Sequence, residues 1–313
     1  MNNNVRQRIL IIKLGALGDF VMQMDYVAAI HKAYPNAHFT FMTSKPFVPF
    51  VKCLSWVEDI IVDSHPRLNL MEWVRICKKQ IADRHFDFIF DLQNSKRTRE
   101  RYFSLVRFFS AQSVTWMGFQ KKAPMCVRRI DKKHAWSLGK VTFDKMEIPL
   151  EPVDLSVFKG EEKNFHLLPD VPFALVIPGC SPKHPYKRYP KELYTEVVQM
   201  LEAKGVPAVV LGTRVEAEQI SYICAHTHAI NFQDKASLLD MPALAKRALC
   251  VIGNDTGPVH MACLCGTKGV VLFCEKTSKS AQNLANIKNI IATNIGDIPP
   301  TEILKQLSDL IKD

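Results

Sequence analysis

Long apolar runs are missing from this chain. No stretch approaches the roughly 18 consecutive apolar residues that a membrane span needs. Residues 1–6 carry a single positive charge and lead into a short apolar run, so the long apolar stretch and the cleavage site of a secretory signal are missing as well. The nine cysteines are odd in number and irregular in spacing, which argues against a disulfide framework. These absences predict a cytoplasmic protein.

Several nucleotide and metal motifs are also absent. The first glycine-containing segment, 13–19, reads KLGALGD and lacks both the third glycine of a dinucleotide fingerprint and the Gly-Lys-Ser/Thr of a P-loop. There is no Asp-x-Asp that would hold magnesium on a nucleotide sugar. The histidines and cysteines of 226–228 and 260–265 include no paired Cys-x-x-Cys. We therefore interpret these cysteines as small core residues and expect no metal site.

What is present fits a globular protein of two domains. The 313 residues, 47% of them hydrophobic and 23% charged, exceed what one hydrophobic core usually serves. The 41 Lys and Arg residues outnumber the 31 Asp and Glu residues, and a net charge of +10 favours polyanionic partners. Nucleic acid, an anionic membrane surface and a phosphorylated glycolipid all qualify. The basic residues are scattered and are not interleaved with aromatic residues, so we expect no nucleic-acid binding.

Short apolar runs alternate with helical patterns along both halves of the chain. Apolar runs typical of buried parallel strands lie at 8–13, 39–42, 60–62, 86–90, 113–117, 173–177, 208–211, 249–252 and 270–273. Helical patterns lie at 18–34, 70–82, 190–204, 215–224 and 257–265. This alternation predicts an α/β fold, in which helices cover both faces of parallel sheets. Prolines bracket a charged stretch at 148–172, which we interpret as a domain linker.

Open α/β sheets bind ligands beyond the carboxyl ends of their strands, so the loops at those ends are the candidate sites. Asp19 follows the first strand and opens the first helix. A carboxylate at a helix start is stabilised by the helix dipole and can cap the helix. It can also project from the loop as a general base. The sequence alone leaves both interpretations of Asp19 open.

Residues 253–260, GNDTGPVH, again join an apolar strand to a short helix. The backbone N–H groups of Thr256 and Gly257 would face a ligand above the strand, and a diphosphate there would gain from these donors and from the helix dipole. Pro258 fits the first helical turn, where its missing N–H costs nothing. The alternative is a plain Asp or Thr cap. His260 lies one helical turn beyond Thr256 and on the same face, although a lone histidine at such a position is more often a core residue.

Two further loops follow strands of the second half. Residues 178–190 contain four prolines and the cations Lys183, Lys187 and Arg188, which could neutralise the charge on a departing phosphate or form a solvated surface loop. Residues 211–216 end in Glu216, which could accept hydrogen bonds from ribose hydroxyls or act as a partner of the helix dipole. The sequence does not separate these alternatives.

Together these segments resemble glycosyltransferase family 9, whose best-known members are the ADP-heptose:lipopolysaccharide heptosyltransferases. The most specific segment is Asp-Thr-Gly-x-x-His after a hydrophobic strand, which runs from Asp255 to His260. The other matching segments are 9–19 with its Gly18-Asp19 pair, 86–93 (FDFIFDLQ), 187–190 (KRYP) and 212–216.

The resemblance implies a GT-B architecture, with two Rossmann-like doubly wound domains facing a central cleft. Residues 1–155 would form the acceptor-binding domain and residues 156–313 the nucleotide-sugar-binding domain. The implied activity is that of an inverting, metal-independent glycosyltransferase without a cofactor, which moves heptose from ADP-heptose to the inner core of lipopolysaccharide. An anionic acceptor of this kind would bring the cytoplasmic protein into peripheral contact with the inner membrane surface.

The resemblance also assigns roles to residues of this chain. Asp19 matches the family's proposed general base, and its carboxylate would take the proton of the acceptor hydroxyl. Lys187 and the backbone of 255–257 match the residues that hold the donor diphosphate, where they would replace a metal. The remaining donor-binding positions are Gly212, Thr213, Glu216 and His260. Lys96 and Arg97, after the fourth strand, suit an anionic acceptor.

Two segments depart from the family pattern. Many members have Gly-Pro-Thr after the strand that ends at Phe273, whereas this chain has CEKTS at 274–278, and many have proline where this chain has Asp25. The first change alters the donor end. A family 9 transferase that uses another nucleotide sugar, or a non-catalytic nucleotide-sugar-binding homologue, is therefore an alternative. Retention of Asp19, Lys187 and Asp255 argues against the non-catalytic homologue.

Overall fold

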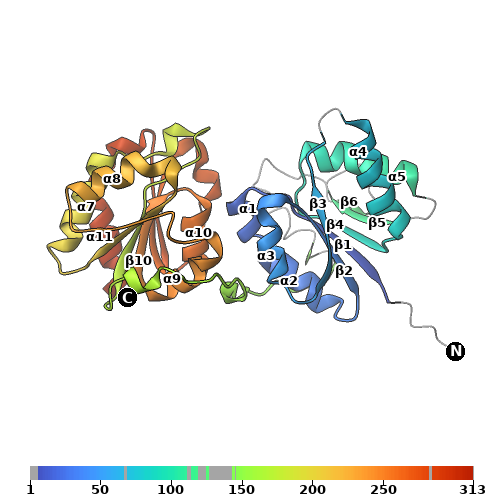
Figure 1. The fold of residues 1–313 in the computed structure, drawn as a ribbon, viewed down its shortest axis with the longest axis horizontal. Helices are drawn as coiled ribbons and strands as arrows, with labels where there is room; N and C mark the ends of the chain where they lie inside the picture. Colours follow the sequence, from blue (N-terminus) through green and yellow to red (C-terminus); the bar gives the residue numbers. More distant parts are fainter. Residues whose placement is uncertain are drawn as a thin grey trace. The chain divides into compact units, whose positions relative to one another are not determined.

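The computed structural model describes residues 6–66, 69–110, 114–118, 125–126, 143–144, 146–281 and 284–312. The chain divides into two compact units, Met1–Val153 and Asp154–Asp313. Each unit is built on a six-stranded sheet whose described strand pairs are all parallel (Figure 1). Among the helices that the structure describes, none is both long and apolar enough to span a membrane.

The N-terminal sheet has the strand order of a Rossmann fold, β3-β2-β1-β4-β5-β6. Its strands are β1 (Arg8–Ile12), β2 (His38–Ser44), β3 (Val57–Asp63), β4 (Phe88–Asp91), β5 (Thr115–Gly118) and β6 (Met125–Cys126). β1 lies between β2 and β4, and the register pairs Ile12 with both Met42 and Asp91. Because a central parallel strand is covered on both faces, residues 9–12 of β1 are all apolar and buried.

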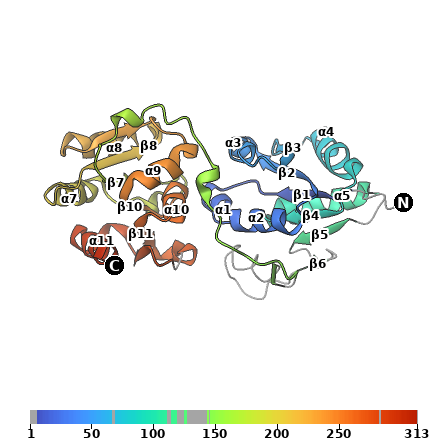
Figure 2. The same ribbon diagram turned by 90° about the horizontal axis from the view of Figure 1, so that it is seen from below.

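Helices cover both faces of this sheet (Figure 2). They are α1 (Leu17–Val21), α2 (Met24–Ala33), α3 (Val48–Lys52), α4 (Leu70–Val74) and α5 (Phe103–Phe109). On one face the ring of Phe20 in α1 packs against Phe41 of β2 and Phe50 of α3. On the other face Trp73 of α4 and Val106 of α5 join the core of the unit.

The C-terminal sheet repeats this order as β12-β11-β10-β7-β8-β9, counted from its own first strand β7. Its strands are β7 (Phe173–Ile177), β8 (Ala208–Gly212), β9 (Ile230–Gln233), β10 (Ala248–Asn254), β11 (Lys268–Cys274) and β12 (Ile287–Ala292). β7 and β10 are neighbours, with Ile177 opposite Gly253.

The helices of the C-terminal unit are α7 (Lys191–Glu202), α8 (Ala217–Ala225), α9 (Met241–Arg247), α10 (Gly257–Leu264) and α11 (Pro300–Lys312). Figure 1 shows α7, α8 and α11 on one face of the sheet and α9 and α10 on the other. The first face buries a core to which α11 contributes Ile303, Leu304, Leu307 and Leu310 at helical spacing.

Several elements differ from the sequence-based expectation. The helix expected at 18–34 is interrupted at residues 22–23, and the helix expected at 70–82 continues beyond α4 as a wider π turn, Arg75–Ile81. Of the strand expected at 113–117, Ser113 lies outside the described residues. The stretch 148–172 is only in part a linker: its residues from Asp154 onward belong to the C-terminal unit, where Leu155, Phe158, Phe165 and Leu168 are buried.

The strand order reverses beside the first strand of each sheet, between β1 and β4 and between β7 and β10. Ligands of open parallel sheets bind at this switch point, beyond the carboxyl ends of the strands. The loops that leave the two switch points begin at Lys13 and Leu92 in the N-terminal unit and at Pro178 and Asp255 in the C-terminal unit. Most candidate residues from the sequence lie on these four loops or just after them.

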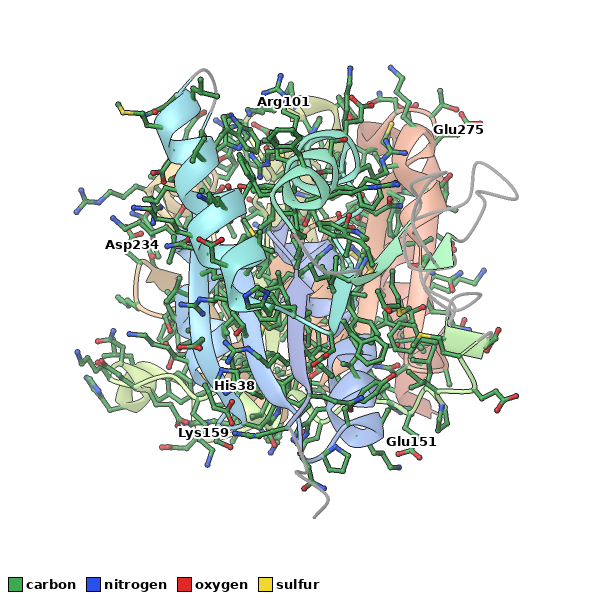
Figure 3. All side chains as sticks on the ribbon, turned by 90° about the vertical axis from the view of Figure 1, so that its right-hand side faces the viewer. His38, Arg101, Glu151, Lys159, Asp234 and Glu275 are labelled. Carbon is green, nitrogen blue, oxygen red and sulfur yellow. The ribbon has the colours of Figure 1, made fainter. Side chains whose placement is uncertain are left out.

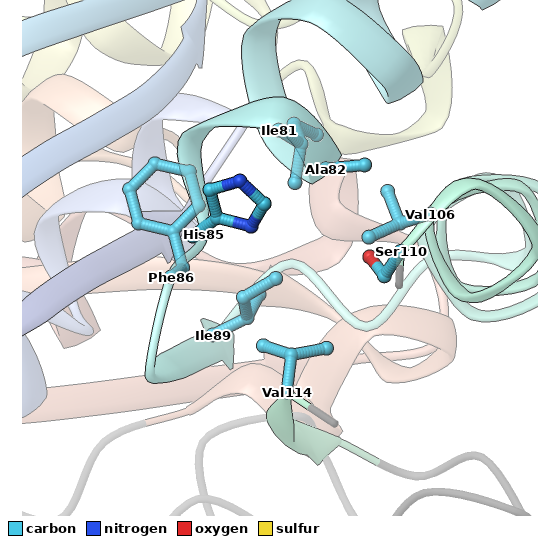
Figure 4. A pocket seen from close by; sticks show the side chains of 8 residues that line it. All are labelled: Ile81, Ala82, His85, Phe86, Ile89, Val106, Ser110 and Val114. Carbon is cyan, nitrogen blue, oxygen red and sulfur yellow. The ribbon is translucent and has the colours of Figure 1, made fainter. Parts of the chain in front are cut away.

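The amino ends of the N-terminal strands carry other features. His38, at the start of β2, contacts Glu58 (Nδ1 to Oε2, 2.6 Å) and Asp59 (Nε2 to Oδ2, 2.9 Å). Figure 3 shows His38 and Arg101 at opposite ends of the sheet. A small pocket near the start of β4 is lined by Ile81, Ala82, His85, Phe86, Ile89, Val106, Ser110 and Val114 (Figure 4). Neither feature shares a residue with the four loops.

Candidate functional site

Lys187, Asp255 and His260 form a contact network at the switch point of the C-terminal sheet. The Nζ of Lys187 donates to Oδ2 of Asp255 at 2.6 Å, and Nε2 of His260 lies 2.8 Å from Oδ1 of the same carboxylate. The side chains of Asp255 and His260 are 5% and 4% exposed, and that of Lys187 is 18% exposed. The structure thus brings together three residues that the sequence offered in two separate motifs.

The Asp255 carboxyl is ionised although it is buried. Burial alone would raise its pKa, but hydrogen bonds from His260 and Lys187, together with the charges of these groups, lower the pKa to about 2. An ammonium group has three donors, and within the described part of the chain Lys187 donates a side-chain hydrogen bond only to Asp255. Lys187 is therefore held in place by a fixed negative charge while further donors remain for a ligand.

The first turn of α10 is not capped by a side chain. Thr256 is the N-cap residue, yet its hydroxyl makes no capping bond, and the turn closes with the bond from His260 N to Thr256 O at 3.0 Å. The N–H of Gly257 precedes that bond and has no partner within the helix. Oγ1 of Thr256 and Nδ1 of His260 are buried with no hydrogen-bond partner among the described residues. A helix start with unfilled donors attracts an anion.

Asn254 ties the loop after β7 to the end of β10. Its Nδ2 donates to the carbonyls of Pro178 (2.8 Å) and Gly179 (3.0 Å), and its Oδ1 accepts from Tyr194 Oη (3.0 Å) and Tyr189 N (3.3 Å). The side chain is fully buried, so each of these bonds is shielded from water. Asn254 thereby fixes both ends of the loop that carries Lys187.

Glu216 serves the local helix start in this structure. Its Oε2 accepts from the backbone N (2.9 Å) and Oγ1 (2.8 Å) of Thr213, which completes a capping box. A Cβ at Gly179 would lie 2.8 Å from Glu216 Cγ, and one at Gly212 would lie 3.3 Å from its Cβ, so glycine at both positions lets the glutamate sit between the loops after β7 and β8. Oε1 of Glu216 has no hydrogen bond to any residue that the structure describes.

In the N-terminal unit, the loop after β1 is held by its two neighbouring strands. Gln93, just after β4, accepts with its Oε1 from the backbone N of Leu14 (2.9 Å) and of Gly15 (3.1 Å), and the hydroxyl of Ser44, at the end of β2, donates to the carbonyl of Leu14. Gly15 has φ = 133°, and a Cβ there would lie 2.7 Å from the Phe47 ring. The position therefore requires glycine.

Asp19 lies in the first turn of α1 and is half-buried. Its charged neighbour is Lys13, a lysine only 2% exposed at the end of β1. Burial lowers the pKa of Lys13 to about 8, although the nearby carboxylates of Asp19 and Asp91 favour its charged form. Asp91, at the end of β4, is 4% exposed and accepts from the backbone N of Asn94 at 2.8 Å. A carboxylate near such a compensating cation can accept a proton from a substrate hydroxyl.

The two basic residues after β4 are placed differently. Lys96 is exposed and lies 4.0 Å from Glu100. Arg97 turns inward, where its Nη2 lies 2.6 Å from Oδ2 of Asp63 and where Tyr102 donates to Oδ1 of the same carboxylate at 2.6 Å. Nε and Nη1 of Arg97 are buried without a hydrogen-bond partner in the described ranges.

The sequence analysis missed three residues that shape these sites. Lys13 and Asp91 are charged residues directly at the ends of otherwise apolar strands, and that interruption was a usable signal. Asn254 directly precedes Asp255 and was the third polar signal of this kind. In the part of the chain that is described, no group of three or more His, Cys, Asp or Glu residues is arranged to hold a metal ion.

Comparisons with known proteins relate the chain as a whole to one enzyme family. The family model of glycosyltransferase family 9 (heptosyltransferase) matches residues 74–310. Lipopolysaccharide heptosyltransferase 2 of Salmonella typhimurium is 22% identical, over 98% of this chain and 99% of the relative. A family 9 glycosyltransferase structure from Veillonella parvula superposes with a TM-score of 0.79 at 18% identity, over 98% of this chain and 97% of that one.

The E. coli heptosyltransferase WaaC, solved with ADP, superposes with a TM-score of 0.75 at 16% identity, over 97% of this chain and all of the other. At such identities the structures show the fold, and the predicted GT-B class is confirmed. The predicted enzyme class is confirmed by the family match, which covers well over half of the sequence. The chain belongs to glycosyltransferase family 9.

Proposed function

We propose that this protein transfers heptose from ADP-heptose to the inner core of lipopolysaccharide, by an inverting displacement that uses no metal. The observation that carries this proposal is the Lys187–Asp255 pair beside the uncapped start of α10. The relatives named lipopolysaccharide heptosyltransferase 2 and the WaaC structure with ADP support the choice of substrates.

The C-terminal unit binds the donor. Its diphosphate accepts hydrogen bonds from the backbone N–H of Gly257, from the hydroxyl of Thr256 and from the ammonium of Lys187. These groups are fixed before the ligand arrives, so they stabilise the charge that develops on the departing diphosphate without reorganising. Oε1 of Glu216, which its capping role leaves free, accepts from the ribose hydroxyls.

The N-terminal unit binds the acceptor and supplies the base. The acceptor oxygen attacks the anomeric carbon opposite the leaving group, and Asp19 takes the hydroxyl proton as the new carbon–oxygen bond forms. The bond between the anomeric carbon and the diphosphate oxygen breaks, and its electron pair leaves with ADP. One displacement of this kind inverts the anomeric configuration.

Cations of the N-terminal unit favour an anionic acceptor. Lys96 presents an exposed ammonium to an acceptor, whereas the adjacent Arg97 is turned inward to Asp63. Together with the net charge of +10, this ammonium favours a phosphorylated or carboxylated core sugar and a peripheral contact with the cytoplasmic membrane surface.

A thermal-shift screen of ADP, UDP and GDP and their sugars tests the donor assignment. ADP and ADP-heptose should raise the melting temperature most, because a ligand that binds only the folded state stabilises it by mass action. The Lys187→Met variant, run in parallel, should lose most of this shift. A larger shift with UDP or GDP would contradict the ADP assignment, and transfer that stops on addition of EDTA would contradict the metal-free mechanism.

A second candidate is transfer of another sugar within the same family. It is favoured by the departure of residues 274–278 from the family pattern. In that segment Lys276 lies over the ring of Tyr186, 5.6 Å from its centroid, and Tyr186 belongs to the loop that carries Lys187. The nucleotide sugars of the same screen separate the two candidates, since only the sugar with productive contacts adds to the shift of its diphosphate.

A further inference from the structure

One helix layer of the N-terminal unit exposes apolar side chains that its core does not use. The layer consists of α4, the π turn Arg75–Ile81 that continues it, the π turn Arg97–Tyr102 and α5. These elements pack side by side, and their inner residues join the core: Trp73, Ile76, Phe103 and Val106. Among the large apolar side chains in the described ranges, the three most exposed all lie on this layer: Leu70 (71%), Met71 (81%) and Phe108 (80%).

The same layer is strongly cationic. Residues 70–81 and 97–109 hold seven Lys and Arg residues against two Asp and Glu residues, which accounts for half of the net charge of +10. Each acidic residue has a cation beside it. Glu72 accepts from Nε of Arg75 at 2.6 Å, and Glu100 lies 4.0 Å from Lys96. The exposed cations without an ion pair to any described residue are Lys78, Lys79 and Arg107.

The apolar side chains lie at both ends of the layer, and the cations lie between them. α4 follows β3 and the π turn Arg97–Tyr102 follows β4, so both stretches run from the carboxyl end of the parallel sheet to its amino end (Figure 1). Leu70 and Met71 therefore lie at the carboxyl end and Phe108 at the other end. The loop that carries Asp19 also leaves the carboxyl end of the sheet.

We propose that this layer docks flat on an anionic lipid bilayer, with Leu70, Met71 and Phe108 in the headgroup region and the cations on the lipid phosphates. Apolar side chains flanked by Lys and Arg are what binds a helix layer to such a surface. This docking surface rests on the membrane contact of the proposed function and specifies the part of the chain that makes it. A docked layer keeps the carboxyl end of the N-terminal sheet beside the membrane that holds the acceptor.

Two other occupants match the layer less well. A second copy of the chain would bring two surfaces of like charge together, which opposes association. A single strand of nucleic acid stacks its bases on exposed aromatic rings, whereas this layer buries Trp73, Tyr102 and Phe103. An anionic bilayer satisfies both the apolar side chains and the cations.

Co-sedimentation with lipid vesicles measures docking in the absence of substrates. The whole chain should bind vesicles made of equal parts phosphatidylglycerol and phosphatidylcholine. Vesicles of phosphatidylcholine alone should bind it at least about tenfold more weakly, because each Lys or Arg near an anionic surface adds to the affinity. Added salt should weaken binding to the anionic vesicles, since it screens this attraction.

The apolar contact is tested with the double variant Leu70→Ser and Met71→Ser. It should bind the anionic vesicles at least about tenfold more weakly than the wild type, because the two side chains no longer enter the headgroup region. The matched control is Val171→Ser with Ile291→Ser, which changes two half-exposed apolar residues of the C-terminal unit and should bind normally. All four positions are exposed, so the melting temperatures of both variants should match that of the wild type.

The cationic contact is tested with Lys78→Gln and Lys79→Gln. This double variant should also bind at least about tenfold more weakly, and its binding should depend less on salt. Lys204→Gln with Lys305→Gln removes the same charge from exposed positions of the C-terminal unit and is the control. Its vesicle binding should stay close to that of the wild type.

Turnover separates docking from catalysis. The Leu70→Ser, Met71→Ser variant should keep wild-type kcat/KM on an acceptor freed of its acyl chains, and should lose at least about tenfold on the acylated acceptor in vesicles. Wild-type binding without preference for anionic vesicles would overturn the proposal, and so would unchanged binding of either double variant. A wild-type dimer that the same substitutions dissociate would assign the layer to a second copy instead. Vesicle binding without heptose transfer would overturn the proposed activity and leave the docking surface intact.

Discussion

The two units share one strand order but differ in the electrostatics of their switch points. In the N-terminal unit one buried ammonium, that of Lys13, serves the two carboxylates of Asp19 and Asp91. In the C-terminal unit the partners of the single carboxylate of Asp255 are Lys187 and His260, and the start of α10 adds its dipole. The first site has an excess of negative charge, whereas the second favours a bound anion.

This difference shows what the shared topology does and does not determine. The strand order fixes where the loops emerge, and the same geometry therefore recurs in both units. The few side chains at the ends of β1, β4, β7 and β10 then decide whether a loop suits a proton transfer or a phosphate. Changes at those side chains should accordingly have effects that stay within one unit.

The largest expected effect comes from Asp19→Asn. The amide keeps the shape of the side chain but cannot take a proton, so kcat should fall at least about a hundredfold. Donor affinity, measured by calorimetry with ADP, should stay within about twofold, because the proposed donor contacts lie in the other unit. A weaker ADP affinity in this variant would contradict the proposal that the base and the donor contacts belong to different units.

Lys187→Met should have the next largest effect, and on the opposite quantity. Loss of a charge-assisted hydrogen bond costs about 1.5–3 kcal/mol, which corresponds to roughly a 10- to 150-fold weaker affinity for ADP. Lys204→Met, an exposed lysine just after the other end of α7, is the matched control. Equal ADP affinities for the two variants would remove Lys187 from the donor site.

Glycine substitutions compare how the two loops are held. Gly15→Ala places a Cβ 2.7 Å from Phe47 at φ = 133°, and Gly253→Ala places one 2.5 Å from Val259 Cγ2 and 2.7 Å from the carbonyl of Ile177. Each should lower the free energy of unfolding by up to about 3 kcal/mol in urea titrations. Gly296→Ala, whose nearest contact would be 3.4 Å, should change it little. A tolerated Gly253→Ala would mean that the end of β10 adapts easily.

Opposite electrostatic effects act on the two charged groups, but in both units stability should rise with pH, at low pH in the C-terminal unit and at high pH in the N-terminal unit. The folded-state pKa of Asp255 is about 2, below its unfolded value, so its stabilisation of about 2 kcal/mol is present above pH 4 and is lost between pH 4 and pH 2. The folded-state pKa of Lys13 is also depressed, to about 8, but an ammonium is destabilised by this, so the folded state gains stability as the pH rises from about 8 to 10.5. The free energy of unfolding, measured in urea as a function of pH, should not rise between pH 2 and pH 4 for Asp255→Asn as much as it does for the wild type. For Lys13→Met it should lack the rise between about pH 8 and 10.5.

Much of the fold could be predicted from apolar runs. The run 173–177 coincides with β7, and the runs in β1, β8, β10 and β11 were found because central parallel strands are buried on both faces. β9 and β12 were missed because both are edge strands with half-exposed residues and no continuous apolar run. The amphipathic pattern of α11 was present in the sequence and was overlooked.

The candidate site could be predicted in its parts but not in its contacts. Lys187 and Asp255 lie 68 residues apart, and only the adjacency of β7 and β10 brings them together, which local patterns do not encode. Glu216 was given two interpretations, and the structure adds a capping bond to Thr213 without excluding a ribose contact. Lys13 was passed over because a lysine after a strand usually reaches solvent, and only the packing of α1 and β4 shows that it does not.

Asn254 holds the two ends of the loop 178–190, and its side-chain bonds do not involve the middle residues 181–186. Its side chain donates to the carbonyls of Pro178 and Gly179 at the start of the loop and accepts from the backbone N of Tyr189 at the end of the loop. Substitutions among residues 181–186 should therefore leave these bonds, and with them the two ends of the loop, in place. Under the proposed function, sugar preference can therefore change in residues 181–186 while the end of β10 keeps its contacts with the two ends of the loop.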